Sequence, residues 1–132
     1  MLSSSDRLDI VDLVHRADNA ATQRNADLYV SYFTDDAVLD GDQGEHRGLD
    51  HLRQSVGPIW ASEGPSSTHA TLNVVVDTVD NEPDRAIASS LLLILRNELP
   101  APVENLSFIT QHVVRTDEGW LIARRTVRSV PG

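Results

Sequence analysis

The chain contains no cysteine among its 132 residues. Disulfide bonds, thiolate nucleophiles and cysteine-ligated metal sites are therefore excluded, and any chemistry has to use oxygen and imidazole groups. Aromatic residues make up only 5% of the chain. The longest apolar run, residues 91–95, falls far short of the roughly 20 residues that a membrane-spanning helix requires. The N-terminal segment also lacks the apolar core of a signal peptide. These absences predict a cytoplasmic protein with no membrane partner.

Positive charge is scarce. The chain carries 11 Lys and Arg residues against 20 Asp and Glu residues, a formal net charge of -9. Because such a surface repels a phosphate backbone, we expect no nucleic-acid partner. The hydrophobic content of 40% and charged content of 23% are ordinary for a globular protein. The length fits one domain that covers residues 1–132.

Helical periodicity dominates the first half. Apolar residues recur at helical spacing in 5–23 and again, behind a possible Asn25 cap, in 27–33. Residues 37–40 suggest a short strand, and a turn rich in Gly and Asp follows as far as Gly48. A third helix is expected next, bent or interrupted at Gly57 and Pro58.

The second half is rich in Val, Ile, Leu and Thr, which favours long antiparallel strands over 68–79, 85–97, 106–116 and 120–130. Helices followed by a strand meander predict an α+β domain. Within 91–95, alternate leucines point to one face and Leu92 and Ile94 to the other. Helices can cover only one face, so we expect a homodimer through the outer face. The alternative is a central strand covered by its own loops.

Short motifs occur in a fixed order along nearly the whole chain: residues 13–16, 25–27, 32–38, 48–52, Thr68-His69 with Asn73, and 117–122 with Arg125. This order resembles that of SnoaL-like proteins in the nuclear transport factor two-like superfamily. The resemblance implies a cone-shaped α+β barrel, with three N-terminal helices packed on a curved, mostly antiparallel sheet. It also implies a deep, mostly apolar pocket for a hydrophobic, oxygenated small molecule. Small side chains at Ala17, Ala20 and Ala21 would leave room for it.

The resemblance also places the family's catalytic positions. Dehydratase-like members carry a Tyr and an Asp on the first helix, opposite a His on the first long strand. Here His69 matches the His, whereas Ala17 and Thr22 occupy the Tyr and Asp positions. In the ketosteroid isomerase pattern, Gly41 stands at the general base and Gln111 at the acidic oxyanion donor. Gln111 is a neutral amide that can still donate a hydrogen bond.

Three residues are candidates for catalysis. His69 shares a strand face with Thr71 and Asn73, which suits the lining of a wet cavity, and imidazole suits proton transfer near neutral pH. Asp18, four residues before Thr22, stands on the same helical face and is a replacement for the missing carboxylate, unless it is simply solvated. Asp40 ends a strand near the expected pocket mouth, but it equally suits the following turn.

A further set is expected to line the pocket and bind substrate: Ala17, Thr22, Trp60, Asn73 and Gln111. The competing roles are core packing for Trp60 and satisfaction of neighbouring backbone for the two amides. Arg125 either anchors carboxylates of the first helix or reaches the pocket floor.

Cofactor signals are missing from the sequence. The other four histidines show no metal-site spacing, and there is no HExxH motif or Gly-rich phosphate loop. We therefore expect no metal and no cofactor. Two functions stay open: a lyase (a dehydratase, for example), isomerase or cyclase that uses His69 as acid or base, and a non-catalytic ligand-binding or accessory protein, such as a dioxygenase β subunit.

Overall fold

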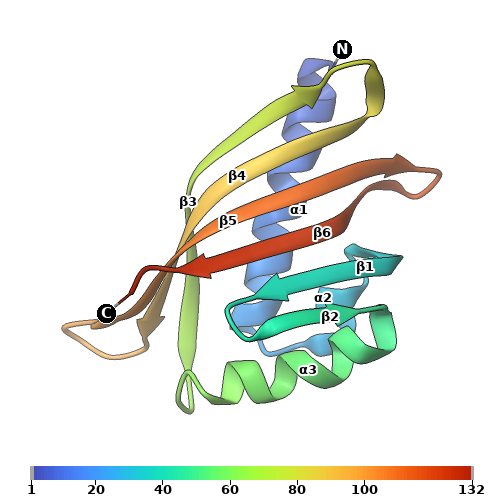
Figure 1. The fold of residues 1–132 in the computed structure, drawn as a ribbon. Helices are drawn as coiled ribbons and strands as arrows, with labels where there is room; N and C mark the ends of the chain where they lie inside the picture. The colour runs from blue at the N-terminus through green and yellow to red at the C-terminus, as the bar shows by residue number, and fades with distance from the viewer. Residues whose placement is uncertain (1, 132) are drawn as a thin grey trace.

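The computed structural model describes residues 2–131, which form three helices and a six-stranded sheet. The helices are α1 (Ser4–Thr22), α2 (Ala26–Val30) and α3 (Leu49–Ala61). The strands are β1 (Phe33–Gly41), β2 (Gly44–Arg47), β3 (Ser67–Val79), β4 (Glu82–Arg96), β5 (Val103–Thr116) and β6 (Gly119–Ser129). Figure 1 shows α1 lying across one side of a curved sheet, with α3 beneath β1 and β2. No helix in this part of the chain is long and apolar enough to cross a membrane.

The first helix begins with a reciprocal cap. The Ser3 hydroxyl accepts a hydrogen bond from the backbone N–H of Asp6, and the Asp6 carboxylate accepts one from the N–H of Ser3. Apolar side chains such as Ile10, Val14 and Ala17 are fully buried against the sheet and the other helices. The helix predicted over 5–23 is therefore confirmed, because cap and periodicity agree.

The segment after α1 differs from its prediction. The helix expected over 27–33 ends at Val30, and Phe33 already belongs to β1, which pairs in parallel with β6. The turn predicted between Asp40 and Gly48 contains the additional strand β2, which forms a hairpin with β1. Tertiary pairing outweighs local propensity here, since β2 is short and its side chains are mostly exposed.

The third helix is also more regular than expected. It begins after Gly48, whose φ of 85° is a left-handed conformation that favours glycine. It then continues through Gly57 and Pro58 without the predicted interruption. Burial of Leu52, Val56 and Trp60 on one side anchors it over this stretch.

The sheet has the strand order β2-β1-β6-β5-β4-β3. The four long strands predicted from the sequence are all present, with ends within a few residues of the expected ones. All neighbouring strands are antiparallel except β1 and β6. The sheet curves strongly but does not close into a complete barrel. The predicted α+β fold is confirmed, with the helices packed on one side of this open sheet.

The two sheet faces differ as the alternation in β4 predicts. Leu92 and Ile94 are buried on the inner face, whereas Leu91 and Leu93 are half-buried on the outer face. Phe108 stands beside Leu91 in the register of β4 and β5 and is 58% exposed. The outer face is thus a row of apolar side chains without a covering helix (Figure 1).

We propose that this outer face pairs two copies of the chain, as expected from the sequence. Leu93→Glu places a charge on the face without touching the core, so it should convert a dimer into a monomer. Light scattering at micromolar concentration measures the change. Leu99→Glu is the matched control, because Leu99 is 95% exposed in the loop after β4. A wild-type protein that already has monomer mass would contradict the proposal.

Candidate functional site

His69 lies on β3 with its side chain on the inner face of the sheet. It pairs with the buried Ile94 of β4, and its backbone N–H donates to the Thr22 hydroxyl of α1 over 2.8 Å. The ring Nε2 lies 2.8 Å from Oε1 of Glu63. Both side chains are nearly enclosed, with 5% of His69 and 11% of Glu63 exposed. The imidazole is therefore held by a carboxylate in a partly dry environment.

Glu63 is a functional candidate that sequence reasoning missed. It lies in the loop between α3 and β3, and its Oε1 also accepts a hydrogen bond of 2.9 Å from the Ser67 hydroxyl. The loop is tied to the end of α1, because Arg24 donates to the backbone carbonyl of Gly64 over 2.8 Å. Only a carboxylate six residues before His69 hinted at the pair, and loop residues carry no periodic signal.

A second carboxylate forms a separate buried pair. Oδ1 of Asp18 lies 3.0 Å from Nη1 of Arg125, and the exposed fractions of the two side chains are 2% and 5%. The Thr71 hydroxyl donates to Oδ2 of Asp18 over 2.5 Å. Burial lowers the pKa of Arg125, but its interactions with Tyr29 and Asp18 outweigh this and raise it above the usual value. Of the two roles predicted for Arg125, the anchoring of a helix carboxylate is the one observed.

Unpartnered polar atoms lie beside this pair. Gln111 is fully buried, and neither its amide oxygen nor its amide nitrogen has a hydrogen-bond partner among the described residues. It stands directly opposite Arg125 in the register of β5 and β6. The Ser90 hydroxyl on β4 is likewise without a partner. Because a polar group buried without a partner costs free energy, Gln111 and Ser90 weaken this part of the core.

Tyr29 on α2 is a second residue that the sequence did not single out. It is 4% exposed and packs edge-on against Trp60, with ring centroids 5.3 Å apart. Burial raises the pKa of its hydroxyl, while Arg125 opposes this rise and Asp18 and Glu63 add to it. Trp60 itself is buried and packs in the core.

A hollow of about 370 Å³ opens between α1 and β3. Its walls are His15, Arg16 and Asn19 of α1 together with His69 and Thr71 of β3. The volume falls in the usual range for small-molecule sites. The lining is polar and open to solvent, unlike the deep apolar cone implied by the resemblance. Ala17, expected to leave room in the cone, is instead fully buried in the core.

The remaining predicted residues lie apart from this hollow. Asn73 has a φ of 56° at a point where the register of β3 shifts, and it is exposed rather than aligned with His69 and Thr71. Strand parity therefore does not extend past the irregularity. Thr22 touches His69 only through the backbone N–H described above.

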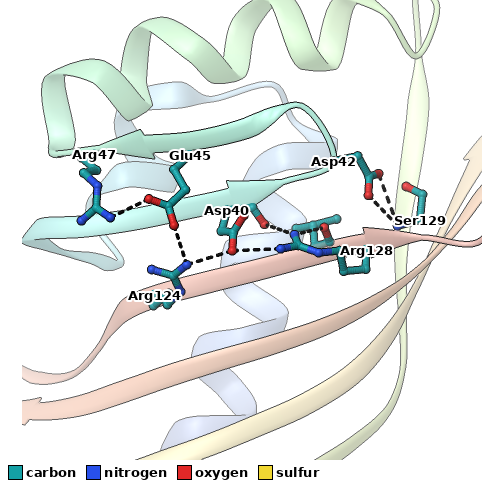
Figure 2. A network of polar contacts seen from close by, with 8 residues as sticks. Asp40, Asp42, Glu45, Arg47, Arg124, Arg128 and Ser129 are labelled. Carbon is teal, nitrogen blue, oxygen red and sulfur yellow. Dashed lines mark hydrogen bonds and ion pairs between the residues drawn. The ribbon is translucent and has the colours of Figure 1, made fainter.

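Asp40 belongs to a charged network between β1 and β6. Figure 2 shows its carboxylate between Arg124 and Arg128, at 2.8 and 3.0 Å. The hydrogen bond from Arg128, followed by that from Arg124, holds the pKa of Asp40 below its usual value. Nearby, Glu45 bridges Arg124 and Arg47, and Asp42 accepts from the backbone of Ser129. A carboxylate held in this way fastens two strands and is a poor proton acceptor.

The residues that the structure describes contain no group of three or more side chains suited to a metal ion. The chemistry available at the hollow is that of the carboxylate-bound imidazole of His69, the hydroxyl of Thr71, the amide of Asn19 and the guanidinium of Arg16.

Comparison with known proteins connects this geometry to a family. The family model described as SnoaL-like domain matches residues 3–126. A protein of unknown function with a cystatin-like fold from Nostoc punctiforme is 21% identical, with a TM-score of 0.90 over 99% of this chain and 96% of that chain. No curated protein matches the sequence significantly.

Two further solved structures come from Novosphingobium aromaticivorans. A proposed aromatic ring hydroxylase is 20% identical, with a TM-score of 0.81 over 100% of this chain and 94% of that chain. A proposed scytalone dehydratase is 16% identical, with a TM-score of 0.78 over 98% and 89% of the two chains. At these identities the likeness establishes the fold.

Proposed function

Because the chain belongs to the SnoaL-like domain family, we propose that it is an enzyme that transfers a proton on a small oxygenated organic molecule, without a cofactor. The reaction is that of a lyase, isomerase or cyclase, and His69 is the acid or base. One observation carries the proposal: Nε2 of His69 is bound to Glu63 at 2.8 Å while the ring borders an open hollow. An oriented imidazole beside a ligand-sized space is the usual arrangement for general acid–base catalysis.

The geometry leaves one ring nitrogen for the substrate. If Nε2 carries the ring proton and donates a hydrogen bond to Glu63, then Nδ1 has a free lone pair. Nδ1 has no hydrogen-bond partner among residues 2–131, and His69 borders the hollow. We propose that Nδ1 is the ring atom that meets a substrate C–H beside a carbonyl.

We assign stabilisation of the developing negative oxygen to donors that line the hollow, the Asn19 amide and the Arg16 guanidinium. Preorganised donors of this kind stabilise an enolate oxygen because they need no reorganisation when charge develops. Asp18 supports the site through Thr71, which lines the hollow and whose hydroxyl donates to Oδ2 of Asp18 over 2.5 Å.

A ligand-binding or accessory role is the second candidate, and a specific observation favours it. Ala17 and Thr22 carry no charge at two family catalytic positions, and the Thr22 hydroxyl is already used by the backbone of His69. The hollow is also wide open to solvent rather than enclosed. A binder with this site would hold a ligand without accelerating any proton transfer.

Proton exchange in deuterated water separates the two candidates without the natural substrate. The probe is 2-tetralone, a bicyclic ketone with acidic protons beside its carbonyl, and ¹H NMR follows their replacement by deuterium. The enzyme proposal expects exchange well above the buffer rate, because Nδ1 removes a proton and a deuteron returns to the same carbon. Exchange at the buffer rate, with NMR shifts that show the ketone bound at His69, would favour the binder.

A further inference from the structure

We propose that Glu63 is the positioning residue for His69, replacing from the loop after α3 the carboxylate that α1 lacks at Thr22. The inference deepens the proposed function and rests on it. Glu63 is not among the site residues predicted from the sequence. Its Oε1 lies 2.8 Å from Nε2 of His69.

Thr22 does not orient the imidazole of His69. Its hydroxyl accepts a hydrogen bond from the backbone N–H of His69, not from the ring. Thr22 therefore fastens β3 to the end of α1 and leaves the imidazole unoriented. A catalytic imidazole needs a partner that selects its tautomer and ring angle, so the partner has to come from another element.

Glu63 is held in place by contacts within the chain itself. Its Oε1 accepts from the Ser67 hydroxyl at 2.9 Å as well as facing His69. The adjacent carbonyl of Gly64 is bound by Arg24, which follows the C-terminus of α1. With only 11% of its side chain exposed, Glu63 is well shielded from competing water. These contacts hold the Glu63 carboxylate in one position, whereas the side chain of an unanchored loop would be mobile.

A carboxylate that accepts the Nε2 proton keeps the lone pair on Nδ1 and stabilises the imidazolium that forms when Nδ1 takes a proton. Glu63 does not touch the hollow, so it acts only through His69. If the pair only fastened the loop to β3, its loss would lower the stability of the protein but would not change the tautomer ratio of His69.

The experiment measures the imidazole tautomer of His69 by ¹⁵N NMR and the exchange rate of 2-tetralone in the same variants. Glu63→Ala should mix the two tautomers and slow exchange by about tenfold to a hundredfold, with little change in KM. Glu63→Gln retains an acceptor oxygen, so it should keep the tautomer but lose rate with the charge. Glu63→Asp should fall between wild type and Glu63→Ala. Glu98→Gln is the control, since Glu98 is exposed and pairs with Arg96.

Two results would overturn the inference. One is a wild-type tautomer ratio in Glu63→Ala, and the other is a wild-type exchange rate in both Glu63→Ala and Glu63→Gln. Glu63→Gln changes no size, so it guards against loss of the fold in the alanine variant. If wild-type protein gives no exchange at all, the proposed function fails, whereas the tautomer comparison still decides whether Glu63 orients His69.

Discussion

Asp18→Ala is expected to lower the free energy of unfolding by about 3–5 kcal/mol, because it leaves the buried guanidinium of Arg125 without its counter-charge. Oδ1 of Asp18 lies 3.0 Å from Nη1 of Arg125, and both side chains are almost fully enclosed. The substitution also removes the acceptor of the Thr71 hydroxyl. Chemical denaturation monitored by circular dichroism measures the loss.

Two companion variants give this prediction its controls. Asp12→Ala breaks an exposed ion pair with Arg16 on the same helix and should change stability little, since surface pairs contribute little. Asp18→Leu combined with Arg125→Met removes both buried charges, so it should recover most of the stability lost in Asp18→Ala. A single Asp18→Ala variant as stable as wild type would show that Arg125 finds another partner or water.

The regular parts of the fold were predictable because several local signals agree in them. The helix α1 has both a cap and a buried stripe, and the long strands combine β-branched residues with alternating burial. The hairpin strand β2 has almost no apolar residues, and its pairing with β1 is what makes it a strand. Pairing between distant segments leaves no period in the sequence, and for this reason a turn was predicted there.

The only site residues that could be predicted together were those that lie on the same strand. His69 and Thr71 share the inner face of β3 and border the same hollow, as alternation predicts. Glu63 comes from a loop and Tyr29 from a short helix, and only tertiary packing brings the Glu63 carboxylate to His69 and the Tyr29 ring against Trp60. Asn73 shows the opposite failure, because the register shift in β3 takes it off the expected face.

Asp40 illustrates why a residue's place in the chain does not decide its chemistry. Its position at the end of β1 suited either a base at a pocket mouth or a structural carboxylate. Two arginines from β6 bind it in the structure, and their hydrogen bonds lower its pKa. Those arginines lie more than eighty positions away in the sequence. No local pattern could have revealed them.

His69→Ala is expected to reduce the exchange of 2-tetralone by roughly a hundredfold or more, the usual cost of removing a general acid or base. His69 borders the hollow and is the proposed acid or base, while Glu63 contacts only its Nε2 side. Thr22 holds the backbone of residue 69, so alanine at this position keeps that hydrogen bond and the fold should persist. The measured quantity is the exchange rate per protein molecule, corrected for the buffer rate.

Added imidazole makes the same test specific for proton transfer. The space vacated in His69→Ala lies beside an open hollow, so free imidazole can enter it and should restore part of the lost rate in proportion to its concentration. His112→Ala is the matched control, because His112 is exposed on β5 and should exchange the ketone at the wild-type rate. If His69 had only a structural role, His69→Ala would lower the stability of the protein and added imidazole would not change its exchange rate. A His69→Ala variant that exchanges the ketone as fast as wild type would show that His69 takes no part in the proton transfer. The carboxylate at Glu63 would then be a fastening between the loop and β3, and the hollow would be a binding site alone.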